Sequence, residues 1–68
     1  MQIRTEDGVM VQPGDTVFNY YDMKVCTIGT PDDQGWFDTT NQDGSRGAYL
    51  NGERICSMGF AGRKGWLG

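Results

Sequence analysis

Apolar residues in the first 56 positions occur in short runs, and sequences typical of tight turns separate these runs. The runs are rich in β-branched and aromatic residues, which favour strands over helices. Turns this frequent leave room for strands of about four to seven residues and for no long helix before residue 57. The pattern therefore predicts an all-β domain. The turn sequences are Asp7-Gly8, Pro13-Gly14, Asp32-Asp33-Gln34-Gly35, Asp43-Gly44 and Asn51-Gly52.

Seven segments between these turns carry the strand pattern, and we expect them to supply five or six short antiparallel strands. Gly29 lies inside one segment and predicts a bulge or a bend there. Residues 20–24 predict an irregular connection that carries two aromatic side chains. Asn51-Gly52 is the strongest hairpin signal in the chain. The segments are residues 3–5, 9–11, 16–20, 25–30, 36–40, 46–50 and 53–56.

The length of 68 residues allows one small domain, and a domain of this size buries only about 60% of the surface of its unfolded chain. Strands this short do not build a two-sheet sandwich, whereas one strongly bent sheet removes most of its exposed edges. The sequence thus predicts a small SH3-like barrel. An OB-like barrel is the alternative, although it usually needs more residues and a helix between strands. We expect a core of Val11, Val17, Ile28, Phe37, Leu50 and Ile55, with one cysteine beside them.

The pattern changes after Ser57, so we divide the chain into a barrel at residues 1–56 and a tail at residues 57–68. Glycine recurs at every third position of the tail and disfavours a stable helix, although Ser57 is a suitable cap for one short turn. We therefore expect an irregular tail, with three alternatives. It packs its aromatic rings across the barrel end, stays mobile, or becomes ordered on a partner or on a second copy. Its candidate contact residues are Phe60, Arg63, Lys64 and Trp66.

The net charge of −3 is unevenly distributed along the chain. All nine acidic residues and three cations lie before residue 54, so this part carries −6, whereas the remaining residues carry +3. An acidic body repels phosphates, which disfavours nucleic-acid binding. One alternative is a nucleic-acid-associated module that uses only Arg54, Arg63 and Lys64. Another is an acidic inhibitor that mimics DNA, which requires the carboxylates to form one continuous stripe.

Residue types that support catalysis are missing or unfavourably placed. The chain has no histidine, and Cys26 and Cys56 lie in apolar strand segments, which is typical of inert buried thiols. The adjacent acids Asp32 and Asp33 are explained as turn formers. Residues 39–50 only partly resemble a calcium loop, because a threonine and a leucine stand where that loop needs an aspartate and a glutamate. We therefore predict no enzyme, no metal site and no cofactor.

The cellular compartment is indicated by what the sequence lacks. No apolar run approaches the roughly 18–20 residues of a membrane span, and no apolar signal segment precedes the first turn. We therefore expect a cytoplasmic protein with two reduced cysteines, and one disulfide between them is the alternative.

Aromatic residues are too numerous for the thin core of such a barrel, so some of them must be exposed. In SH3-like barrels the loop after the entry strand meets the strand that carries the tryptophan, and we expect Tyr20 or Tyr21 near Trp36. A rim of rings and acids suits a basic or proline-rich peptide, through ring packing and cation–π contacts. The alternative is that the rings only cover the barrel ends. The candidate partner-binding residues are Tyr20, Tyr21, Asp22, Trp36 and Tyr49.

Three stretches of the chain also carry a family resemblance. They are residues 19–24 (Asn-Tyr-Tyr-Asp-Met-Lys), 35–38 (Gly-Trp-Phe-Asp) and 50–57 (Leu-Asn-Gly-Glu-Arg-Ile-Cys-Ser). Together they resemble small uncharacterised proteins of actinobacterial phages, of the SH3-like barrel type. The resemblance implies an accessory protein that binds a host or phage protein in the cytoplasm of an infected cell. It implies no catalytic residues.

Overall fold

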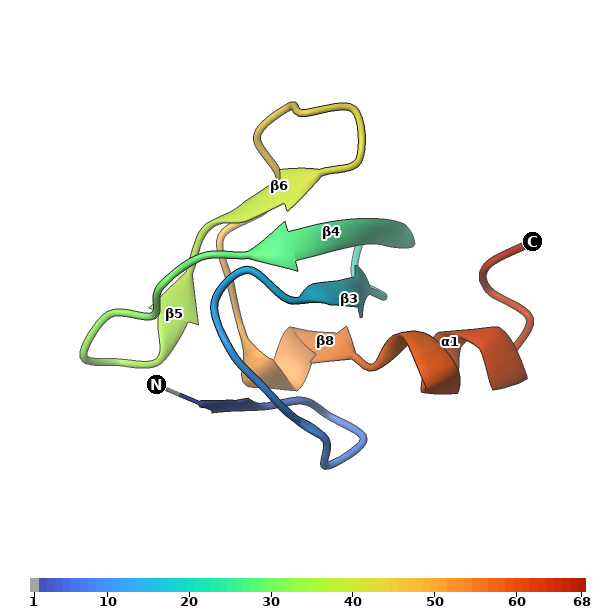
Figure 1. The fold of residues 1–68 in the computed structure, drawn as a ribbon, viewed down its shortest axis with the longest axis horizontal. Coiled ribbons are helices and arrows are strands. Elements are labelled where there is room, and N and C mark those ends of the chain that lie inside the picture. The colour runs from blue at the N-terminus through green and yellow to red at the C-terminus, as the bar shows by residue number, and fades with distance from the viewer. Residues whose placement is uncertain (1) are drawn as a thin grey trace.

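The computed structural model describes residues 2–68, which form short strands and two short helices (Figure 1). The strands are β1 (Ile3–Arg4), β2 (Met10–Val11), β3 (Thr16–Asn19), β4 (Lys24–Ile28), β5 (Trp36–Phe37), β6 (Thr39–Asn41), β7 (Leu50–Asn51) and β8 (Ile55–Cys56). The 3-10 helix η1 (Gly52–Arg54) lies between β7 and β8, and the helix α1 (Met58–Arg63) follows β8.

Antiparallel pairing joins the strands into three small sheets within residues 2–68. The largest has the order β6-β4-β3-β8, and the others pair β1 with β2 and β5 with β7. The molecule is thus built mostly of antiparallel strands with one short α-helix, as the turn pattern predicts. The described residues form no closed barrel, so the expectation of closure is wrong.

The sheets stay separate because the segment predicted as one strand at residues 36–40 changes partner halfway. β5 pairs with β7 and β6 pairs with β4, and Asp38 separates the two strands. Gly29 lies against this bend, since its N–H donates to the Asp38 carbonyl oxygen at 2.8 Å. A Cβ at Gly29 would lie 3.1 Å from the same oxygen, so this approach favours glycine. β4 ends at Ile28, so Gly29 lies just after the strand rather than inside it as predicted.

The hairpin predicted at Asn51-Gly52 is wrong, because β7 and β8 belong to different sheets. The Asn51 side chain instead accepts a hydrogen bond from the Glu53 N–H at 3.1 Å and caps η1. Gly52 is required by a close tertiary approach, since a Cβ there would overlap the carbonyl oxygen of Arg4. The strand predicted at residues 46–50 is also mostly absent, apart from one bridge between Arg46 and Thr40 and the start of β7.

The apolar side chains form two clusters because successive residues of a strand point to opposite faces of a sheet. Val17 belongs to the first cluster and Phe18 to the second. The predicted core is confirmed in the first cluster, where Val11 is partly buried at its edge. Its buried members are Ile3, Val17, Cys26, Ile28, Phe37, Leu50 and Ile55. The second consists of Phe18, Cys56 and Ala61, packed against Tyr20, Val25, Met58, Phe60 and Trp66.

The C-terminal segment folds onto the second cluster, so the expected irregular tail is wrong for residues 58–63. The Ser57 hydroxyl caps α1 by accepting from the Phe60 N–H at 3.2 Å. Trp66 then stacks on Phe18, with 5.6 Å between the ring centroids. Burial of these side chains offsets the low helix propensity of the glycines. Of the three alternatives, the structure therefore shows a packed segment, although it covers a sheet face rather than a barrel end.

Candidate functional site

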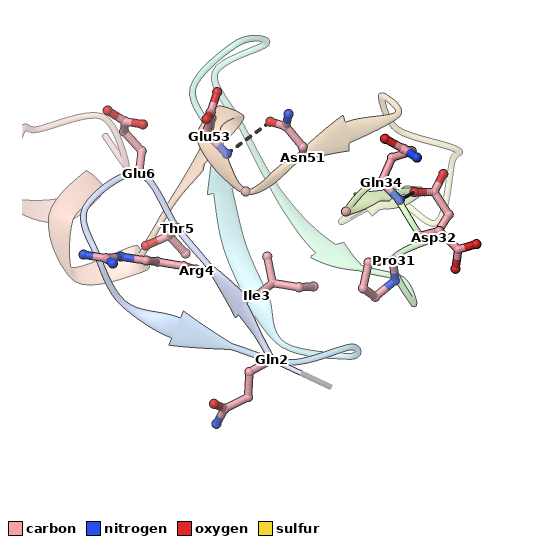
Figure 2. A pocket seen from close by; sticks show the side chains of 13 residues that line it. Gln2, Ile3, Arg4, Thr5, Glu6, Pro31, Asp32, Gln34, Asn51 and Glu53 are labelled. Atoms are coloured by element: carbon pink, nitrogen blue, oxygen red, sulfur yellow. Dashed lines mark hydrogen bonds between the residues drawn. The ribbon is translucent and has the colours of Figure 1, made fainter.

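An open groove of about 890 Å³ lies between β1, the loop before β5, and η1 (Figure 2). In Figure 2 the Ile3 side chain points into the space between β1 and Pro31, whereas Arg4 points away from Pro31 and Asp32. The groove therefore has an apolar floor at Ile3 and Pro31. Arg4, the only cation among its lining residues in the described chain, turns outward, and the carboxylates of Glu6 and Glu53 lie at the outer edge. Its lining residues are Gln2, Ile3, Arg4, Thr5, Glu6, Pro31, Asp32, Asp33, Gln34, Gly35, Asn51, Gly52 and Glu53.

The loop on one side of the groove is organised by Asp32. Its Oδ1 accepts hydrogen bonds from the N–H groups of Gln34 at 2.8 Å and Trp36 at 3.0 Å. Its Oδ2 accepts from the Tyr49 hydroxyl. These bonds, with that from Tyr49 the strongest cause, hold the pKa of Asp32 below its ordinary value of 3.8. Gly35 completes the turn with φ of 84°. Asp32 therefore stays ionised and acts mainly as a structural residue.

The nine carboxylates fall into two groups, according to whether they have a hydrogen-bond or ion-pair partner within the described chain. Six accept a hydrogen bond or form an ion pair within the described chain. Most of these contacts are local, which is how acids stabilise turns. The other three have no such side-chain partner within residues 2–68, and all three line the groove. The satisfied acids are Asp7, Asp15, Asp22, Asp32, Asp38 and Asp43, and the unsatisfied acids are Glu6, Asp33 and Glu53.

A stacked aromatic pair adjoins the groove on the side of Asp32. The rings of Trp36 and Tyr49 have their centroids 5.6 Å apart at 23°. Trp36 is half-buried, whereas Tyr49 is 54% exposed. The hydrogen bond to Asp32 is the main reason that the pKa of Tyr49 lies above its ordinary value of 10.0. The tyrosine therefore keeps its proton and holds the pair against the groove wall.

The other predicted partner-binding residues make different contacts, and the expected proximity of Tyr20 or Tyr21 to Trp36 is not seen among the ring contacts of residues 2–68. Tyr20 donates its hydroxyl to the carbonyl of Glu53, and its ring centroid lies 6.4 Å from that of Trp66. Tyr21 lies beneath the Arg54 guanidinium, 4.9 Å from its carbon to the ring centroid. Within residues 2–68 no ring contact joins these two tyrosines to Trp36. Tyr20 instead contacts η1 and Trp66, and Tyr21 contacts Arg54 of η1.

The remaining predicted residues are near these tyrosines or on α1. Asp22 accepts a hydrogen bond of 3.3 Å from the Asn19 side-chain amide, within the turn after β3. The Lys64 ammonium lies 5.4 Å from the ring centroid of Phe60, and Arg63 is exposed on the last turn of α1. Trp66 is half-buried by its stacking on Phe18. The structure therefore joins Tyr20 to the tail residues and separates both from Trp36 and Tyr49.

The two cysteines are buried, unpaired and on opposite faces of the main sheet. Cys26 is opposite Val17 in the first cluster, and Cys56 is opposite Phe18 in the second. Burial raises the pKa of both thiols above their ordinary value of 9.0. Both are therefore protonated packing residues at neutral pH, and the alternative of a disulfide is wrong for this structure.

The described part of the chain also yields two findings on metals and membranes. No group of three histidine, cysteine, aspartate or glutamate side chains in residues 2–68 lies close enough to hold a metal ion. No helix within that range has the length and apolar character needed to cross a bilayer. Comparison with models of protein families, with curated proteins and with solved structures finds no match to this chain.

The groove residues Glu6, Asp33 and Glu53 are absent from the sites predicted by sequence. Glu6 precedes one turn sequence, Asp33 lies within another and Glu53 follows a third, and nothing local distinguishes them from the other acids. Their separation in sequence also hides their proximity to one groove. Only the tertiary contacts show which carboxylates are left without a partner.

Proposed function

We propose that this chain is a non-enzymatic protein-interaction module whose groove holds an extended basic segment of a partner protein. One observation carries the proposal: every carboxylate that has no hydrogen-bond or ion-pair partner within residues 2–68 lines the same groove. An ionised group that makes no contact with its own fold is available for an external cation. The apolar floor at Ile3 and Pro31 adds a surface for the aliphatic parts of such a segment.

The aromatic pair beside the groove extends this surface. The exposed part of Tyr49 and the edge of Trp36 suit a proline ring or a cationic side chain, through packing and cation–π contacts. Exposed ion pairs contribute about 0.2–1 kcal/mol each, so three carboxylates supply roughly 0.6–3 kcal/mol. Apolar and aromatic contacts must therefore provide most of the affinity, and the acids mainly provide selectivity for a basic partner.

The setting we propose follows from the resemblance to small proteins of actinobacterial phages. In it the chain is an accessory protein in the cytoplasm of an infected cell, and the partner is a host or phage protein. We further propose that the fold is an opened variant of the SH3-like barrel. The strand succession around the first cluster and the irregular turn after β3 support this, and the groove then corresponds to the open seam.

The proposal is tested with a synthetic peptide of alternating lysine and valine, which favours an extended backbone. Isothermal titration calorimetry measures its affinity for the wild type and for Glu53→Gln. The matched control is Asp38→Asn, which changes the net charge equally. Asp38 has only an ion pair of 3.5 Å with Arg46, in which both side chains are mostly exposed, so its loss costs little stability.

We expect saturable binding that weakens with salt, about twofold to fivefold weaker binding for Glu53→Gln, and no change for Asp38→Asn. Absence of binding contradicts the proposal, and so does an equal effect of both variants. Single-stranded DNA is titrated in parallel. Binding of DNA that is lost in the Arg63→Gln and Lys64→Gln variants would favour the nucleic-acid-associated module instead.

A further inference from the structure

The charge of the molecule differs between the two ends of its longest axis, which is 33 Å long. Figure 1 shows the loop before β5 at the left end and the end of α1 with the C-terminus at the right. The loop carries Asp32 and Asp33 of the groove, whereas residues 54–68 contain three cations and no acid. The acidic groove and the basic helix end are therefore far apart in one molecule.

The end of α1 is an exposed tip that carries two cations. Residues 62–65 are all exposed, and Gly65 turns the chain with φ of 77°. Arg63 and Lys64 make no ion pair within residues 2–68. Leu67 is 45% exposed and lies beside Gly62, since a Cβ at Gly62 would be 3.7 Å from the leucine side chain. The tip thus presents two cations next to an apolar side chain.

These features match those of the groove, which offers unsatisfied carboxylates around an apolar floor. The tip is held on its own molecule by the stacking of Trp66 on Phe18, so it cannot reach the groove of the same chain. A second copy meets no such restriction. Charge complementarity of this kind fixes the orientation of association more than its strength.

We propose that the tip formed by Arg63, Lys64 and Leu67 of one copy docks into the groove of a second copy. The inference rests on the proposed function, because it uses the same groove and names its partner. The contact joins two different surfaces at opposite ends of the molecule, so it repeats head to tail and gives open chains or rings rather than a two-fold symmetric dimer. A basic segment of another protein competes with the tip for the groove.

The experiment is sedimentation velocity of the full chain from micromolar to millimolar concentration, at low and high salt. One variant reverses two charges of the groove (Asp33→Lys with Glu53→Lys). Another reverses the two charges of the tip (Arg63→Glu with Lys64→Glu). Two controls reverse charges outside both surfaces, at Asp38→Lys and Arg46→Glu. Circular dichroism verifies that each variant keeps the wild-type fold.

We expect the wild type and both controls to associate with increasing concentration, and salt to suppress this. Each double reversal removes two attractive charge pairs and introduces two repulsive ones. At the energies typical of exposed charge pairs, we expect this change to weaken the association by about tenfold or more. A mixture of the two reversed variants restores association, because each junction is again between opposite charges.

A wild type that stays monomeric at all concentrations overturns the inference, as does association that both reversals leave unchanged. Neither outcome bears on the lysine–valine peptide. If that peptide binds to a monomeric wild type, the proposed function stands and only self-association is rejected. If the chain associates through charges but the peptide fails to bind, the groove serves self-association and the proposed function is rejected.

Discussion

The carboxylate of Asp7 links the turn between β1 and β2 to the start of α1, and replacing it should loosen the C-terminal segment. It accepts hydrogen bonds from the Ser57 N–H at 2.9 Å, the Ser57 hydroxyl at 2.6 Å and the Thr5 hydroxyl at 2.6 Å. The Ser57 hydroxyl in turn accepts from the Phe60 N–H, so the same group is both clamp and helix cap. The perturbation is Asp7→Asn.

The cost follows from the number and charge of these bonds. A hydrogen bond to a charged group contributes about 1.5–3 kcal/mol, against about 1 kcal/mol for a neutral one. Asparagine keeps one acceptor oxygen but places an NH2 donor towards groups that also donate. We therefore expect Asp7→Asn to lower the free energy of unfolding by about 2 kcal/mol. For a domain of this size that loss lowers Tm by about 8–16 °C.

The pH dependence provides a second measurement. Burial raises the pKa of Asp7, but the hydrogen bonds from Ser57 and Thr5 lower it by more, so it lies below its ordinary value of 3.8. The unfolded chain then binds the proton more readily than the folded chain. The stability that Asp7 contributes is complete above the unfolded pKa and is lost as the pH falls through the folded pKa. The asparagine variant lacks this part of the acid sensitivity.

The assay is urea unfolding followed by tryptophan fluorescence between pH 7 and pH 3. Asp43→Asn is the control, because Asp43 accepts only from Ser45 within its own turn. The rate of chemical labelling of the Cys56 thiol, which lies under the C-terminal segment, measures how often that segment opens. The labelling rate of Cys26, in the other cluster, serves as the internal reference. Equal urea midpoints for the wild type and Asp7→Asn at pH 7 would refute the clamp. A constant difference down to pH 3 would refute the linkage.

Four further substitutions test packing and the role of the aromatic pair. Trp66→Ala removes the ring that covers the second cluster and should destabilise the chain by about 3 kcal/mol, with faster thiol labelling and a loss of near-ultraviolet dichroism. Gly52→Ala should destabilise the chain in thermal unfolding, because its Cβ would overlap the carbonyl oxygen of Arg4. Gly59→Ala in α1 should instead stabilise it by about 0.5–1 kcal/mol, because its Cβ would make only an ordinary contact of 3.6 Å with the Arg63 side chain. Trp36→Ala should leave a folded spectrum and weaken lysine–valine peptide binding about fivefold or more; unchanged affinity would separate the aromatic pair from the groove.

Some features follow from chemistry that acts over a few residues. Gly14 adopts φ of 93° and the Asp15 N–H bonds to the Gln12 carbonyl, as Pro-Gly requires of a turn. Successive side chains of β3 point to opposite faces of the sheet, and both faces are covered, so Val17 and Phe18 are both buried. The apolar character of these residues is therefore enough to predict their burial. These signals are local, and the strands and most of the core could therefore be predicted.

Other features have the same local signals but a different outcome. Asn51-Gly52 is equally suited to a hairpin turn and to a helix cap followed by a glycine that another backbone segment approaches closely. The structure shows the second, since Asn51 caps η1 and the Arg4 carbonyl oxygen lies close to Gly52. Tyr20 is indistinguishable from Trp36 as an exposed ring until the C-terminal segment provides Trp66 for it to contact. The candidate site could not be predicted because it depends on such long-range neighbours.

The short apolar runs and the turn sequences determined the β-strand class, the turn positions and the side chains of the first cluster, because each depends on backbone preference and apolar character close in sequence. The helix at residues 58–63 contains glycines that disfavour a helix, so it depends on packing against a face of the main sheet. The candidate site depended on which carboxylates have a hydrogen-bond or ion-pair partner: six have one within residues 2–68, whereas Glu6, Asp33 and Glu53 have none there. Partners for a charge are supplied by the folded chain in three dimensions, so the property that carries the proposed function exists only in the tertiary structure.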